Sequence, residues 1–73
     1  MKTLKEGKVG ETLIVKSVTA TGAIARRVLD MGLTKGTKVY IRKVAPLGDP
    51  MELSVRGYEL TIRKDDASII EVE

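Results

Sequence analysis

The chain has 73 residues, the length of one small domain. A domain of this size buries only about 60% of the surface that its unfolded chain exposes, so a deep enclosed active site is not expected. Cysteine and histidine are both absent, which excludes disulfides, thiolate metal sites and the commonest general base. The net charge of +3 combines +7 over residues 1–43 with −4 over residues 44–73. A mild basic excess suits an acidic protein surface as well as nucleic acid.

Apolar runs are short throughout the chain. None exceeds three residues, whereas a helix that crosses a bilayer needs about 20. Lys2 and Lys5 are not followed by the apolar stretch of a signal peptide. We therefore expect a single cytoplasmic domain over residues 1–73, with no insertion into a membrane.

The first strand is expected within residues 9–18. Leu13 and Val15 have the spacing of side chains that point to the same, inward face. The alternation breaks at Ser17-Val18, which indicates either a β-bulge or the end of the strand.

A helix is expected over residues 22–31, between the first two strands. Thr21 can act as its N-cap, because a threonine hydroxyl accepts a hydrogen bond from a free amide of the first turn. Gly32 then ends the helix in a left-handed conformation that carries no Cβ penalty, and Leu33 can fold back on Val28. Residues at helical spacing give the helix one apolar face: Ile24, Val28 and Met31.

The second half of the chain carries the clearest strand signals. After a strand over residues 37–44, residues 51–55 and 58–62 alternate apolar and polar side chains. Gly57 supplies the positive φ of a hairpin turn between these two strands. Tyr58 shares the apolar phase of its strand, which predicts a place in the core or at the rim of the barrel.

A final strand is expected over residues 69–72, after one helical turn that Asp65 caps and that runs through Ala67. The chain thus contains five short strands, with one helix inserted between the first and the second. This order predicts a mainly β fold, a small SH3-like five-stranded barrel.

Three motifs in register carry a family resemblance. The first is RRVLDMGLTKG at residues 26–36, the second is APLGDP at residues 45–50, and the third is VRGYELTIR at residues 55–63. In this order they resemble the ferrous iron transport protein A (FeoA) family, over nearly the whole chain. The departures are mild and concern packing, since Val28 stands where leucine is usual.

The resemblance implies a non-enzymatic cytosolic accessory protein of bacterial ferrous iron uptake, with an SH3-like fold and no cofactor. Its implied partner is the membrane ferrous iron permease, whose N-terminal cytosolic part is a GTP-binding domain. We expect the chain to dock on that cytosolic part and to modulate the activity or assembly of the permease. The residues alone do not support tight binding of ferrous iron, because histidine and cysteine are absent. The expected partner-binding residues lie on the exposed side of the helix and in the proline loop: Arg26, Arg27, Leu47 and Asp49.

The charges on the helix also have a structural interpretation. Arg26 and Asp30 are four residues apart and can form an ion pair on a solvated face, worth about 0.3–0.5 kcal/mol. Asp30 lies near the helix C-terminus, where the macrodipole disfavours a carboxylate. It can therefore also accept hydrogen bonds from turn amides around residues 33–36, or meet a cation of a partner.

The loop over residues 45–50 contains two prolines, which restrict the unfolded chain and favour the turn. Leu47 in its centre either tucks under the barrel or is exposed as an apolar anchor for another protein. Asp49 and Glu52 are interpreted as solvated carboxylates, because hard cations need about six or more oxygen ligands. We expect alanine at Leu47 and Asp49 to weaken partner binding while leaving the melting temperature nearly unchanged.

Two alternative functions stay open. A small basic barrel can bind RNA or DNA, although the chain has only two tyrosines, a net charge of +3 and no basic run longer than two. The barrel also resembles the C-terminal domain of iron-dependent repressors, an interaction and metal-responsive module, but the chain lacks the helix-turn-helix part. Because the tyrosines are few, the net charge is small and the basic runs are short, we expect no nucleic-acid partner. Neither a phosphate loop nor a nucleophile–base pair is present, so we expect no catalysis.

Overall fold

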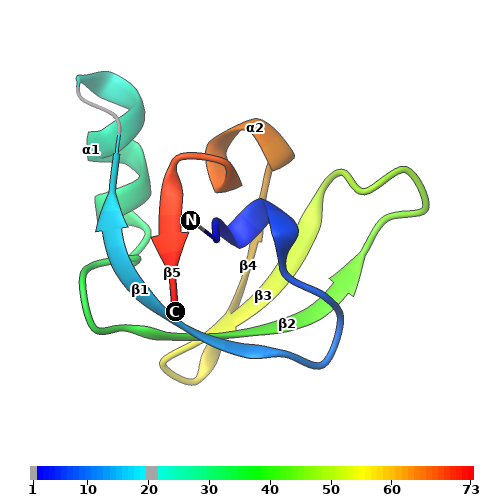
Figure 1. Cartoon of the computed structure of the whole chain (residues 1–73). Helices are drawn as coiled ribbons and strands as arrows, with labels where there is room; N and C mark the ends of the chain where they lie inside the picture. Colours follow the sequence, from blue (N-terminus) through cyan, green and yellow to red (C-terminus); the bar gives the residue numbers. More distant parts are fainter. Residues whose placement is uncertain (1, 20–21) are drawn as a thin grey trace.

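Figure 1 shows the computed structural model of the chain, which describes residues 2–19 and 22–73. The elements in chain order are η1 (Leu4–Glu6), β1 (Thr12–Val18), α1 (Ala23–Asp30), β2 (Lys38–Val44), β3 (Met51–Val55), β4 (Tyr58–Ile62), α2 (Lys64–Ala67) and β5 (Ile70–Val72). The strands form one antiparallel sheet in the order β4-β3-β2-β1-β5, so the outer strands β4 and β5 are not paired with each other. The expected mainly β, SH3-like fold is confirmed, with α1 inserted between the first two strands.

β1 is the strand that curls the sheet into a barrel. Its first half, Thr12–Ile14, pairs with β2, and its second half, from Val15 to Val18, pairs with β5. The register shifts between Val15 and Ser17, a β-bulge that bends the strand from one pairing to the other. The predicted break in alternation therefore marks a bulge, and the strand continues beyond it.

The core lies inside the curled sheet and receives side chains from every strand. Its buried apolar residues are Leu4, Leu13, Val15, Val28, Leu33, Val39, Ile41, Met51, Leu53, Val55, Ile62, Ala67, Ile70 and Val72. The apolar alternation of β4 faces this core only toward its end, because Ile62 is buried while Tyr58 is 47% exposed. Tyr58 lies at the rim, where its hydroxyl donates to the Met31 carbonyl at 2.8 Å. The rim is one of the two places expected for it.

The end of α1 follows the prediction. Gly32 has a φ of 90°. Its N–H donates to the Leu29 carbonyl at 2.9 Å, and the Leu33 N–H donates to the Val28 carbonyl at 3.4 Å. These paired bonds define a Schellman motif, and the accompanying apolar contact is formed by Val28 and Leu33, which are both fully buried.

The start of α1 differs from the prediction. Ile24 was expected on the buried face of the helix, but its side chain is 46% exposed. Val28 is the one residue of α1 that is buried, so only the C-terminal part of this eight-residue helix packs on the barrel. The expected N-cap, Thr21, lies outside the described residues, and Gly22 occupies the N-cap position with a φ of 78°.

The N-terminus of α2 is capped by a residue from another part of the chain. Asp65 was expected to cap this turn, but Arg63 occupies the N-cap position and makes no capping bond with its side chain. The Lys64 N–H donates instead to a carboxylate oxygen of Asp49, in the β2–β3 loop, at 3.0 Å.

No helix in the described ranges is long and apolar enough to cross a membrane.

The turn between β3 and β4 contains two consecutive residues with positive φ. Gly57 has a φ of 85°, as predicted, and Arg56 has a φ of 49°. Two such residues in a two-residue loop are typical of the type I′ turn, whose twist matches that of the flanking strands. Arginine is an uncommon residue at the first of these positions, because its Cβ crowds the backbone there.

Candidate interaction surface

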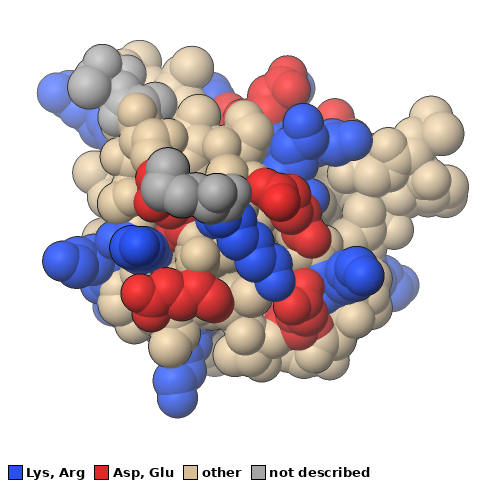
Figure 2. Space-filling model, viewed as in Figure 1, with Lys and Arg blue, Asp and Glu red and all other residues tan. Residues whose placement is uncertain are grey.

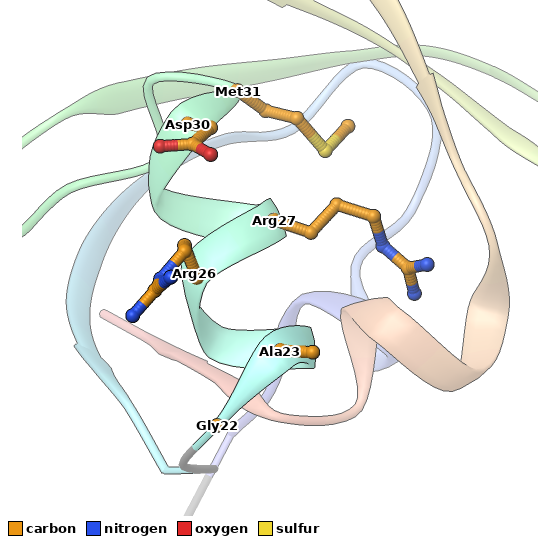
Figure 3. A pocket seen from close by; sticks show the side chains of 6 residues that line it. All are labelled: Gly22, Ala23, Arg26, Arg27, Asp30 and Met31. Atoms are coloured by element: carbon orange, nitrogen blue, oxygen red, sulfur yellow. The ribbon is translucent and has the colours of Figure 1, made fainter.

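A shallow open groove of about 520 Å³ runs along one side of α1. Its lining residues repeat at helical spacing: Gly22, Ala23, Arg26, Arg27, Asp30 and Met31. Figure 3 shows Arg27 and Met31 extending to the same side of the helix, while Arg26 and Asp30 point away from them. The groove thus has two of the four predicted partner-binding residues, Arg26 and Arg27, on its borders.

Arg27 is held by α2. Its Nη2 atom donates to both carboxylate oxygens of Asp66, at 2.9 and 3.0 Å. The side chain of Asp66 is 15% exposed and that of Arg27 is 60% exposed, so the pair ties α1 to α2 at the molecular surface. Figure 3 shows the guanidinium group reaching across to the ribbon of α2.

The expected ion pair between Arg26 and Asp30 is absent from the described structure, in which both residues are exposed. The Asp30 carboxylate also accepts no turn amide among the described residues, which corrects the second structural interpretation. The Gly36 N–H donates to the Val15 carbonyl at 2.8 Å, and the Leu33 N–H is used by the helix end. Two of the turn amides named for Asp30, those of Leu33 and Gly36, are therefore satisfied by the backbone.

The loop between β2 and β3 projects from the barrel, on the right of Figures 1 and 2. Two hydrogen bonds brace it, from the Ala45 N–H to the Pro50 carbonyl at 3.0 Å and from the Gly48 N–H to the Ala45 carbonyl at 2.7 Å. Leu47 is 90% exposed and does not tuck under the barrel. The loop therefore presents an apolar side chain to solvent on a braced backbone.

Asp49 points back from this loop to α2. Its Oδ1 atom accepts the Lys64 N–H, one of the free amides of the first turn of α2. Asp49 thus has a structural partner that Leu47 lacks. The expectation that alanine at Asp49 leaves the melting temperature unchanged is revised accordingly.

α2 lies between the two parts of the predicted surface. Arg27 reaches Asp66 from α1, and Asp49 reaches Lys64 from the β2–β3 loop. In Figure 1, α1 and the loop stand on opposite sides of α2 along the same end of the barrel. The four predicted residues therefore border one end of the molecule, but they do not form a single cluster.

Two exposed apolar residues of α1 lie outside the predicted set. Ile24 is 46% exposed and Leu29 is 45% exposed, and Leu29 follows Arg26 by one helical turn. Helical periodicity shows which residues share a face, but in so short a helix it does not show which flank meets the barrel. Leu29 and Ile24 enlarge the apolar area available on α1.

Charges of both signs are mixed on the surface. Figure 2 shows Lys and Arg side chains beside Asp and Glu side chains over the face in view. At the start of β1, the hydrogen bond from Lys2 and the Lys8 backbone N–H hold the pKa of the Glu11 carboxyl below its usual range. Among residues 2–19 and 22–73, no three acidic side chains come together as a metal site would require.

Comparisons with known proteins point to one family. The FeoA domain family matches residues 2–73. A protein of Porphyromonas gingivalis, described as an Fe(2+) transport protein A/Fe(2+) transporter FeoB fusion protein, is 33% identical over 70 residues. That similarity covers 96% of this chain but only 8% of the fusion protein, so the chain spans a small part of that relative's length.

Two solved structures share the fold closely. The FeoA protein of Chlorobium tepidum is 42% identical, with a TM-score of 0.88 over 99% of this chain and 69% of that chain. The FeoA protein of Stenotrophomonas maltophilia, solved in complex with zinc, is 30% identical, with a TM-score of 0.87 over 100% of this chain and 91% of that chain. That second protein is described as a prokaryotic SH3 domain protein and as a candidate activating factor of ferrous iron transport.

Proposed function

Because the chain belongs to the FeoA family, a family of ferrous iron transport accessories, we propose that it docks on the cytosolic GTP-binding domain of the membrane ferrous iron permease and modulates the permease. One observation supports this partnership most directly. In the Porphyromonas gingivalis relative, a segment similar to this chain and a ferrous iron transporter are named as parts of one fusion protein. Fusion gives two partners a high effective concentration, whereas a chain that is not fused needs a docking surface of its own.

We assign this contact to the end of the barrel formed by α1, α2 and the β2–β3 loop. Leu47 is the proposed anchor, because a highly exposed apolar side chain on a braced loop loses little backbone freedom on binding. Arg26 has no carboxylate partner among the described residues and borders the groove, so it can pair with an acidic residue of the permease domain.

Arg27 and Asp49 have a different part in the proposed contact. Each is bonded to a residue of α2, and together these bonds fix α1 and the loop relative to the same helix. Their substitution is expected to weaken docking by releasing the two contact regions from one another. Modulation of the permease further requires that this surface binds one state of the permease more tightly than the other.

An NMR titration of the labelled chain with the permease's cytosolic GTP-binding domain, at physiological salt, tests the proposal. We expect chemical-shift changes confined to α1, α2 and residues 45–50. Leu47→Ala is expected to weaken binding about tenfold, as is typical for a buried apolar anchor. Val9→Ala is the matched control, since Val9 is also an exposed apolar residue, at 60%, but lies outside the assigned surface.

Single-stranded RNA is the counter-titrant in the same experiment. Docking would be contradicted if the GTP-binding domain caused no chemical-shift changes. Broad and strongly salt-dependent changes with RNA would then favour the nucleic-acid alternative. Equal losses for Leu47→Ala and Val9→Ala would contradict the assigned surface while leaving the partnership itself in place.

A further inference from the structure

Four exposed cations gather around the connection from α1 to β2 and the β3–β4 turn. They are Lys16, Lys35, Lys38 and Arg56. In Figure 1 this connection and this turn lie at the lower end of the barrel, away from α2. The four cations are named here the basic end.

Hydrogen bonds of the fold bring these cations together. The Gly36 N–H donates to the Val15 carbonyl at 2.8 Å, which sets the turn that carries Lys35 against the part of β1 that carries Lys16. Lys38 pairs across the sheet with Ile14, two residues before Lys16. The cations are therefore neighbours on adjacent backbone segments.

Arg56 reaches the same place from the hairpin. Its Nη2 atom donates to the Thr37 hydroxyl at 3.1 Å, next to Lys38 in the sequence. Arg56 also has a φ of 49°, a left-handed conformation in which glycine or asparagine is the usual residue. The hairpin thus holds an arginine where the turn itself favours a smaller residue.

The charge of the basic end is largely uncompensated. The ion pairs of the described structure involve Lys2, Arg27 and Arg42, and none of the four cations takes part in one. Glu73 lies close to this end in the sheet, since its N–H donates to the Ile14 carbonyl at 2.9 Å. No ion pair of the described structure neutralises any of the four cations.

We propose that the basic end binds the anionic headgroups of a lipid bilayer. Three of the four cations are lysines, flexible point charges that suit a layer of mobile headgroups better than one rigid anion. The groove beside α1 includes none of these four cations. Ile14 and Tyr40 are 38% and 44% exposed on the same outer face of the sheet. They supply apolar and aromatic surface of the kind that is favourable at the interface between lipid headgroups and acyl chains.

The basic end and the proposed docking surface lie at different ends of the barrel. In Figure 1, α2 and the β2–β3 loop are at the upper end, and the β3–β4 turn is at the lower end. The molecule can therefore rest on the cytosolic leaflet while its other end contacts a membrane-bound partner. This orientation rests on the proposed function, whereas lipid binding itself does not require the permease.

Co-sedimentation of the whole chain with lipid vesicles tests the inference without any transporter. We expect binding to vesicles rich in phosphatidylglycerol, weakening as salt rises, and none to vesicles of phosphatidylcholine alone. Lys35→Gln/Lys38→Gln should lower the affinity at least about tenfold, because each cation near an anionic surface contributes to attraction. Lys5→Gln/Lys43→Gln is the matched control, since it removes the same charge from exposed positions outside the basic end.

Three outcomes would overturn the inference. The first is no binding to the anionic vesicles at low salt. The second is an equal loss in the two double variants, which would make the attraction a matter of net charge. The third is binding of single-stranded RNA by the basic end with no binding of vesicles, which would assign this surface to nucleic acid. None of these outcomes bears on docking to the permease, which has its own titration.

Discussion

Gly32 and Gly36 adopt nearly the same backbone conformation, with φ values of 90° and 87°, in very different surroundings. A Cβ atom at Gly32 would lie 2.6 Å from the Tyr58 hydroxyl oxygen, whereas a Cβ at Gly36 would meet nothing within 4 Å. The Tyr58 hydroxyl is not free to move without cost, because it donates to the Met31 carbonyl. Glycine at position 32 therefore satisfies both a backbone and a packing requirement.

We predict that Gly36→Ala destabilises the domain by about 1–2 kcal/mol, the cost of a left-handed conformation. Gly32→Ala should cost about 1 kcal/mol more, because it also displaces a hydrogen-bonded hydroxyl. Urea denaturation of the two variants measures the difference. In a Tyr58→Phe background the excess at position 32 should vanish, and its persistence would show that the clash involves something other than the hydroxyl.

Asp49 and Leu47 lie in the same loop between β2 and β3, but their substitutions should affect stability differently. Asp49 accepts the first amide of α2, so Asp49→Ala should destabilise the domain by about 1 kcal/mol, as does the loss of a helix cap. For a domain of this size that change corresponds to a melting temperature lower by about 4–8 °C. Leu47→Ala, at a highly exposed position, should stay within about 0.5 kcal/mol of the parent.

Thermal unfolding followed by circular dichroism distinguishes these two effects, and Asp49→Asn provides the control. Asparagine keeps an oxygen acceptor at the same place, so most of the lost stability should return. A melting temperature unchanged by Asp49→Ala would mean that the capping bond adds nothing to stability. The role of Asp49 would then be interpreted only through binding to the permease.

The strands could be predicted from the sequence because their signal is local. Leu53 and Val55 alternate with polar residues, and this spacing determines which side chains of the strand face inward. Leu13 and Val15 have the same two-residue spacing and are buried, although the Ile14 between them is also apolar. The helix end at Gly32 is local for the same reason, since the Schellman bonds join residues within one turn.

The contacts of α2 could not be predicted because they are not local. Arg27 bonds to a residue 39 positions away and Asp49 to one 15 positions away. A local interpretation gave Asp30 a neighbouring arginine and α2 a cap from Asp65, because those were the partners within reach along the chain. The curled sheet brings closer partners into place, and only the fold itself reveals them.

For the molecule as a whole, stability is expected to depend on pH through Glu11. Its carboxylate accepts from the Lys2 ammonium at 2.9 Å and from the Lys8 N–H at 2.7 Å, and both bonds lower its pKa from the ordinary value of 4.5. A group with a depressed pKa in the folded state stabilises the fold above its unfolded pKa. That contribution is lost as the pH falls through the folded value.

We therefore predict that Glu11→Gln flattens the acid side of the stability profile. The melting temperature of the parent should fall more steeply than that of the variant as the pH falls below 4.5. Near neutral pH the two melting temperatures should change with pH at the same rate. Scanning calorimetry over this range is the measurement. Parallel curves would mean that the unfolded chain keeps the same contact, because only a difference between the two states produces the slope.

β5 completes the barrel only after nearly the whole chain is available. Val18 pairs with Ile70, and the Val72 N–H donates to the Lys2 carbonyl at 3.0 Å, so both ends of the sequence meet at the same seam. A ribosome that still shelters the last strand in its exit tunnel keeps the second half of β1 without a partner. The apolar side of the sheet then stays open in the nascent chain, and such surfaces attract chaperones or other chains. The closing step of the fold thus waits until β5 has left the exit tunnel.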